Sequence, residues 1–502
     1  MLDDDSIDAD WLASLGLDEL VPASLAHWRP LAAEAMSFFL DRLSPDRLAA
    51  MFSEQSALGV DASGNERLVR LLAQCPTLHK LGQVLARQPR LDPVLRRHLQ
   101  SLESMPATAS LEPILGRLRD ELGSELPGEL DPHPLAEGSV AVVLPFRYRD
   151  EQGAQRHGVF KVLRPGIEAR LADELAALPD LATFIERRAA ELGLPRLDFR
   201  DTLASVERLL RQEIRLDREQ LHLRAARRFY RDEPGLLVPA LLPWCTPRVT
   251  AMERVFGTKL NEAELSAAQR PVLAATLVRT LLAKPFWTRL DPAMFHGDLH
   301  GGNLLATEDG RIAVLDWSLV ARVTKRDRER LVAIALGGIT LDSAQIRQAM
   351  AELARCPFDD PVLVEVVERA LDALVLESRV PGFDWLLALL DEFALARATA
   401  FPADLAVFRK SWLTLSGVLH DLAGPVAADV PLIDAGLRQF VGELPARWVA
   451  PPSTRSFSTH VSNADLAGFF ASAWLAGLRY GLRARELGLQ GLRQLAGGAL
   501  HE

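Results

Sequence analysis

The residues most able to do chemistry lie in one short segment, His296-Gly-Asp298-Leu-His300-Gly-Gly-Asn303. Asp298 and Asn303 are five positions apart and follow an apolar stretch. With this spacing an aspartate can accept the proton of an attacking hydroxyl, while the asparagine carbonyl holds a metal ion. The alternative is a glycine-rich turn in which both side chains cap backbone groups.

A second carboxylate follows at Asp316, thirteen residues beyond Asn303 and at the end of an expected strand over 312–315. A kinase places there the aspartate that binds the Mg²⁺ bridging the β- and γ-phosphates of ATP. Carboxylate and amide oxygens suit Mg²⁺, whose remaining ligands are usually phosphate oxygens and water. The two segments together indicate a kinase-like phosphate site, although either segment alone would be weak evidence.

Such a site also needs a lysine on a strand, and Lys161 supplies one in the second arm of an expected hairpin. The first arm, over 139–147, follows a turn of small residues that includes Ala136, Gly138 and Ser139. A single glycine is weak evidence for phosphate binding, but its place before the hairpin favours that interpretation. The alternative for Lys161 is an edge-strand side chain facing water.

The strand lysine of a kinase is normally held by a glutamate on a helix. Glu213 and Glu219 are the candidates. On one helix, six positions turn about 600°, so the two carboxylates cannot share a face. At most one of them pairs with Lys161, and the sequence leaves open which one. The alternative for each is a solvated charge on an amphipathic helix.

The elements around these residues change type along the chain. Apolar spacing predicts helices through most of 1–130, a β hairpin at 139–163, and helices again from 167 to 230. Short strands are expected near 236–252 and 295–323, and helices dominate after 324. The fold class is therefore α+β with a dominant helical share.

Composition narrows the class of protein. The chain has 502 residues, a net charge of −10 and three distant cysteines. The acidic balance argues against a nucleic-acid binder, and no disulfide framework or zinc pattern is expected. The most apolar stretch, 466–478, has 13 residues, whereas a spanning helix needs about 20. We expect a cytoplasmic protein that is at most peripheral to a membrane.

In this order, the segments resemble the UbiB/AarF family of atypical protein-kinase-like proteins. The family signature, Lys-x-Gly-Gln on a helix before the kinase fold, is present as Lys80-Leu81-Gly82-Gln83. Four further features of the family have counterparts in this chain, in the same order. They are the small-residue loop, the lysine before a basic-Pro-Gly turn, the acidic helix and the catalytic loop. The resemblance covers about residues 65–330.

The resemblance implies a bilobal, protein-kinase-like fold and binding of ATP or ADP with Mg²⁺. It divides the chain into a helical extension carrying Lys-x-Gly-Gln (1–130), an N-lobe with inserted helices (131–258), a C-lobe (259–445) and a helical C-terminal segment (446–502).

The resemblance also assigns roles. Lys161 contacts the phosphates, Asp298 is the catalytic aspartate, and Asn303 and Asp316 hold Mg²⁺. Lys80 and Gln83 gate the site. Ala136, Gly138 and Ser139 of the small-residue loop contact the nucleotide. The backbone from Glu253 to Val255 contacts adenine.

Three departures set this chain apart. The family's Asp-Phe-Gly is Asp316-Trp317-Ser318 here, and the small-residue loop carries an acid, Glu137, which would repel phosphate unless it points away. The catalytic loop has Leu299 and Gly301 where the family usually has prolines. Asp-Trp is also similar to aminoglycoside phosphotransferases.

Three functions follow. The first is an ATPase or kinase supporting isoprenoid-quinone or other lipid biosynthesis, with a lipid or quinone precursor and a biosynthetic complex as partners. The second is a small-molecule kinase, and the third is a nucleotide-binding pseudokinase scaffold.

In the C-terminal segment, Phe469, Phe470, Trp474 and Tyr480 lie beside Arg479, Arg483 and Arg485. Such a helix can lie on a membrane surface, although a core-packing helix with a basic end is the favoured interpretation.

Overall fold

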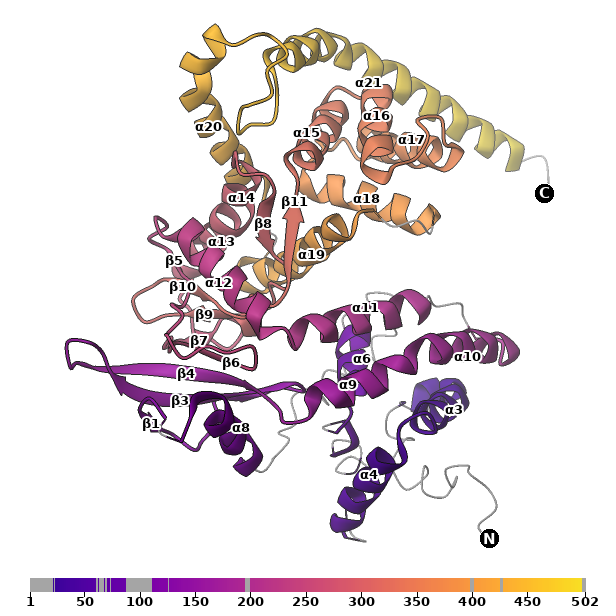
Figure 1. Cartoon of the computed structure of the whole chain (residues 1–502). Helices are drawn as coiled ribbons and strands as arrows, with labels where there is room; N and C mark the ends of the chain where they lie inside the picture. Colours follow the sequence, from indigo (N-terminus) through magenta and orange to yellow (C-terminus); the bar gives the residue numbers. More distant parts are fainter. Residues whose placement is uncertain are drawn as a thin grey trace. The chain divides into compact units, whose positions relative to one another are not determined.

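The computed structural model describes residues 21, 23–59, 62, 67, 70–72, 74–86, 111–124, 126–194, 199–397, 401–424 and 428–498. These residues fall into two compact units (Figure 1). Unit 1 is Met1–Arg224 with Ala240–Arg254, and unit 2 is Ala225–Pro239 with Val255–Glu502. The four-segment division expected from the sequence stays a prediction.

Unit 1 contains a five-stranded antiparallel sheet. Its strands are β1 (Glu129–Leu130), β2 (Ala136–Glu137), β3 (Ala141–Arg149), β4 (Gln155–Leu163) and β6 (Val249–Glu253), and the order is β1-β3-β4-β6 with β2 also on β3. The expected hairpin is confirmed as β3 and β4, in a register that pairs Val143 with Lys161. Buried apolar residues alternate with more exposed ones along part of β3 and favour a strand with one covered face.

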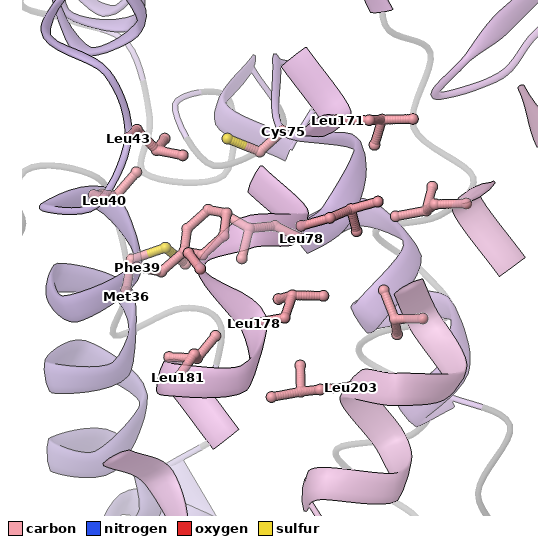
Figure 2. Close-up of a cluster of buried hydrophobic side chains, with 14 of the residues drawn as sticks. Met36, Phe39, Leu40, Leu43, Cys75, Leu78, Leu171, Leu178, Leu181 and Leu203 are labelled. Atoms are coloured by element: carbon pink, nitrogen blue, oxygen red, sulfur yellow. The ribbon is translucent and has the colours of Figure 1, made fainter. Parts of the chain in front are cut away.

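Most helices of unit 1 pack on one another through a separate apolar core, whereas Ile114 and Leu118 of α8 (Glu112–Leu122) pack on the sheet. The helices of the unit are α3 (Arg29–Leu40), α4 (Pro45–Ala57), α6 (Pro76–Ala86), α8, α9 (Ile167–Ala176), α10 (Leu178–Glu191), α11 (Phe199–Glu213) and α12 (Leu216–Tyr230), with the short 3₁₀ helix η1 (Ala23–Trp28) before them. Figure 2 shows this core, in which Phe39 of α3, Leu78 of α6, Leu171 of α9, Leu181 of α10 and Leu203 of α11 gather. The core fixes α6, which carries the Lys-x-Gly-Gln motif, against the helices that follow β4.

Unit 2 combines short strands with many helices. Its strands are β5 (Leu236–Leu237), β7 (Thr258–Lys259), β8 (Ala293–His296), β9 (Leu304–Ala306), β10 (Ile312–Val314) and β11 (Val320–Val323). They form one sheet of order β5-β10-β9-β7 and a second pair, β11-β8. The last six residues of α12, beyond the unit boundary, belong to unit 2, as does the 3₁₀ turn η3 (Gly301–Asn303).

The helices of unit 2 form the largest part of the chain. They are α13 (Gln269–Leu277), the π-helical turn η2 (Val278–Ala283), α14 (Lys284–Phe286), α15 (Lys325–Ile339), α16 (Ser343–Ala354), α17 (Pro361–Leu376), α18 (Phe383–Arg397), α19 (Ala403–Ala423), α20 (Asp429–Val449) and α21 (Asn463–Gly498). This helical C-terminal region and the mixed strands confirm the expected α+β class. Among the described residues, no helix combines the length and the apolar character that crossing a bilayer requires.

Candidate functional site

The strand lysine is held by one of the two candidate glutamates. Lys161, on β4, donates from Nζ to both carboxylate oxygens of Glu219, each at 2.9 Å. Glu219 lies on α12 and is 3% exposed. A bidentate, desolvated pair of this kind fixes the ammonium in one position. The geometry thus selects Glu219 as the partner that the sequence left open.

Glu219 is itself positioned by the residue beside it. The side-chain amide of Gln220 donates to the backbone oxygens of Thr246 and Val249 and to the hydroxyl of Thr250. Thr250 lies on β6 and is paired in register with Lys161. These bonds join α12 to the strand next to β4, so that the helix presents Glu219 to the lysine.

Glu213 has a different partner. It ends α11, and it forms an ion pair with Lys80 of α6. The two glutamates therefore lie on two helices, and the single continuous helix assumed from the sequence is wrong. The side chain of Gln83 lies outside the described part of the chain, so only Lys80 represents the Lys-x-Gly-Gln motif in these contacts.

A buried carboxylate anchors the start of α6. Glu174 of α9 accepts a bond from the backbone N–H of Thr77 at 3.0 Å and another from Arg47 at 2.7 Å. It is 0% exposed, and burial raises its pKa despite these donors. A carboxylate at a helix N-terminus complements the unpaired N–H groups there. No motif or spacing in the sequence indicates a role for Glu174.

The small-residue loop forms a tight hairpin turn. Ala136 and Glu137 pair with β3 as strand β2, and the backbone N–H of Gly138 donates to the oxygen of Ala141 at 2.8 Å. Ser139 lies in the turn that this hydrogen bond closes. The concern that Glu137 would repel phosphate has a structural answer: its carboxylate pairs with Arg164 at 3.2 Å.

The expected adenine contact lies where the two units meet in sequence. Glu253 ends β6 in unit 1, and its backbone N–H donates to the oxygen of Ala240. Val255 is the first residue of the second segment of unit 2. The contact itself stays a prediction.

Unit 2 holds the predicted catalytic loop. The side-chain nitrogen of Asn303 donates to the backbone oxygen of Asp298 at 3.1 Å, which makes the amide oxygen the atom left to bind a metal ion. His300 accepts a bond at Nδ1 from the N–H of Gly302, and its Nε2 lies 3.7 Å from the Asp298 carboxylate. The loop therefore brings Asp298 and Asn303 together, as the spacing predicts.

His296 is a structural residue of the loop for which the sequence alone predicts no role. Its Nε2–H donates to the oxygen of Leu315 at 3.0 Å, and its Nδ1 accepts the N–H of Asp298 at 3.1 Å. Burial lowers the pKa of this imidazole, so the neutral form is favoured. It thereby connects the catalytic loop to the end of the strand before Asp316. Its place two residues before Asp298 was the available signal.

Asp316 has a φ of 50°, in the left-handed region that few residues except glycine, asparagine and aspartate adopt. Its Oδ1 accepts the backbone N–H of Ser318 at 3.1 Å. Trp317 is fully buried, and its ring packs edge-on against His296. The indole N–H donates to the oxygen of Val314. Asp-Trp-Ser is thus a packed turn in which tryptophan is part of the core of unit 2.

The donor set fits Mg²⁺. Among the described residues no group of three or more His, Cys, Asp or Glu side chains could hold a metal ion. Asn303 and Asp316 offer two hard oxygen donors, a set that Mg²⁺ accepts when phosphate oxygens and water complete its octahedron. When bound with ATP, the ion would neutralise charge that develops on the phosphates.

Unit 1 contains a strand lysine paired to a helical glutamate, and unit 2 contains an Asp-Asn loop followed by a further aspartate. These features define a protein-kinase-like domain. Residues 103–350 match the family model described as the ABC1 atypical kinase-like domain. The chain therefore contains a domain of this family, and the resemblance predicted from the motifs is confirmed.

Several relatives carry related names. A "Probable protein kinase UbiB" of Xanthomonas campestris pv. campestris (strain B100) is 31% identical over 56% of this chain and 53% of its own length. The protein of that name from Azotobacter vinelandii (strain DJ / ATCC BAA-1303) is 25% identical over 69% and 66%. An "Uncharacterized protein sll0005" of Synechocystis sp. (strain ATCC 27184 / PCC 6803 / Kazusa) is 27% identical over 68% and 50%. The chain thus spans about half to two thirds of these relatives.

A solved structure titled "The complex structure of Rv3197-erythromycin from Mycobacterium tuberculosis" is also similar. It shares 18% identity, and the match covers 77% of this chain and 97% of that one with a TM-score of 0.46.

Proposed function

We propose that this chain binds Mg-ATP and hydrolyses it or transfers its γ-phosphoryl group, in support of isoprenoid-quinone or other lipid biosynthesis. The observation that carries the proposal is the bidentate Lys161–Glu219 pair, because a desolvated ammonium held in this way is what phosphate contact in a kinase requires. The family match and the names of the relatives support the class of activity.

In this proposal each charged group has one task. Lys161 neutralises the α- and β-phosphates, Asp298 orients the attacking hydroxyl or water, and Asn303 and Asp316 bind the metal ion. The Lys80–Glu213 pair restrains α6, and we assign Lys80 and Gln83 to gating of the site. The hairpin turn at Gly138 and Ser139 covers the phosphates.

The test is phosphate release from Mg-ATP by the purified chain, with and without liposomes, beside an Asp316→Asn variant. We expect release that requires Mg²⁺ and that falls by roughly 10²-fold or more in the variant, because one metal ligand loses its charge. Bound nucleotide without release would contradict an ATPase. It would favour an acceptor-dependent small-molecule kinase or a pseudokinase scaffold, which a screen of hydroxylated metabolites would then separate.

A further inference from the structure

Helix α21 has an unusual distribution of charge. Between residues 464 and 484 it carries three charged side chains, Asp465, Arg479 and Arg483. All three are partly buried and form hydrogen bonds or ion pairs with the rest of unit 2. An ordinary surface helix places its charges outward and its apolar residues inward. Along this part of α21 the charged residues face the protein.

The inward contacts are specific and fix how the helix is turned about its axis. Arg483 donates to carboxylates of Asp372 and Glu368 on α17, and Arg479 pairs with Asp342, which precedes α16. In Figure 1, α21 runs beside α17, and it also contacts α15. Arg479 and Arg483, two of the three arginines that the membrane interpretation would place at a lipid surface, therefore attach the helix to unit 2.

The opposite face is apolar and exposed. Phe470, Trp474, Leu478 and Leu482 recur every four residues, and their exposures are 69%, 88%, 62% and 53%. We call these four residues the α21 apolar face. Spacing of four places them along one side of the helix. At 1.5 Å per residue, the stretch from 464 to 484, whose exposed side chains are all uncharged, is about 30 Å long.

The C-terminal end of α20 also exposes large apolar side chains. Trp448 and Val449 are 88% and 86% exposed. They lie at the N-terminal end of α21, because the backbone oxygen of Arg447 accepts a bond from the side chain of Asn463. Glu443 and Arg447, the charged residues of the last turns of α20, are buried and paired to each other.

We propose that the α21 apolar face, with Trp448 and Val449 at its start, inserts into the surface layer of a lipid bilayer with α21 lying in the plane. A contact with a protein normally has a polar rim around an apolar centre, whereas every exposed position from 464 to 484 is uncharged, as a low-dielectric medium requires. Exposed charges return only at Arg485 and Glu486.

The shape of the face also favours a fluid partner. Gly477 and Gly481 lie between the large side chains, and a Cβ at either would meet nothing within 4 Å. The space beside Trp474 at position 477 is therefore open, and lipid chains can fill it without a preformed groove. Tryptophan is enriched where bilayers meet water.

The test is flotation of the full chain, without nucleotide, on vesicles of phosphatidylcholine alone and of phosphatidylcholine mixed with phosphatidylglycerol. We expect binding to both that persists in high salt, with a blue shift of tryptophan fluorescence. Trp474→Asp together with Leu478→Asp should weaken binding by about tenfold or more, because each places a charge in the interfacial layer. Both positions are exposed, so the thermal unfolding temperature should stay unchanged.

The matched control is Val272→Asp on α13, a position in the same unit that is 63% exposed. It should bind vesicles like the unchanged chain. Failure of the unchanged chain to float on either vesicle would overturn the proposal. So would a stable dimer in sedimentation analysis that Trp474→Asp separates, since a second copy would then cover the face. Neither result depends on ATP hydrolysis, so the proposed activity is tested separately.

Discussion

At the scale of residues, the two lysine–glutamate pairs of unit 1 have different consequences. Glu219→Gln removes the charge that orients Lys161, so we expect ATP turnover to fall by roughly 10²-fold with nucleotide binding weakened. Glu213→Gln releases Lys80 instead, and we expect turnover to fall less or to rise, since the pair restrains α6. Steady-state kinetics of both variants with Mg-ATP makes the comparison.

Glu207→Gln is the control for this pair of variants. Glu207 lies on α11, as Glu213 does, and forms an ordinary surface pair with Arg211. Its loss should leave turnover within about twofold. Equal losses in the Glu213 and Glu219 variants would show that the two pairs act as one and would contradict the assignment.

A second residue-scale prediction concerns acid stability. Burial lowers the pKa of His460 to about 4 and also lowers that of His296. An unfolded histidine titrates near 6.5, so the unfolded chain binds more protons in this range. The contribution of these neutral histidines to the unfolding free energy is therefore complete above about pH 6.5. It is lost as the pH falls towards 4, by up to about 3 kcal/mol for His460.

Urea unfolding of the full chain between pH 7 and pH 4 measures this loss. His460→Asn is the informative variant, because asparagine tolerates the φ of 62° found at this position and does not titrate. Its stability should depend less steeply on pH than that of the unchanged chain. An identical pH dependence in the two proteins would assign the loss to other groups.

At the scale of elements, the anchoring of α6 can be tested through Glu174. Glu174→Ala removes the acceptor for Thr77 and leaves Arg47, which is largely buried, without this carboxylate. We expect unfolding free energy to fall by roughly 3 kcal/mol and amide exchange in α6 to increase. Glu186→Ala, which breaks an exposed pair with Arg200, should cost about 1 kcal/mol or less. Similar losses in both variants would argue against an anchoring role.

The elements also show what the sequence could predict. The β3–β4 hairpin followed from β-branched residues on both sides of a polar turn, and the catalytic loop followed from a spacing fixed by its chemistry. The choice between Glu213 and Glu219 did not follow, because it depends on a break between α11 and α12 and on the bonds of Gln220 to β6. Those are contacts between distant parts of the chain.

The same reasoning explains α21. Its aromatic residues and arginines were visible in the sequence, but an apolar stripe normally marks the buried side of a helix. The carboxylates that reverse this orientation, Asp342, Glu368 and Asp372, come from α17 and from the residue before α16. Only the fold brings them to one side of α21.

At the scale of the whole molecule, the residues after α20 are part of unit 2 and are not simply appended to it. Ser458 and Thr459 bond to Glu443, and the oxygen of Val461 accepts a bond from Arg447. The ring of His460 stacks on Trp287. These contacts fill the side of unit 2 that includes α14, whose C-terminal residue, Phe286, accepts a bond from His460.

A chain ended after Ala450 should therefore be destabilised, because it exposes Phe286 and leaves Glu443 and Arg447 without most of their buried partners. We expect the unfolding free energy of unit 2 to fall by roughly 3 to 5 kcal/mol, read as a lower urea midpoint in tryptophan fluorescence. A chain ended after Leu489 keeps every one of these contacts and should unfold like the full chain. If both shortened chains keep the full midpoint, residues 451–462 do not stabilise unit 2; if both lose it equally, the stabilisation comes from beyond Leu489.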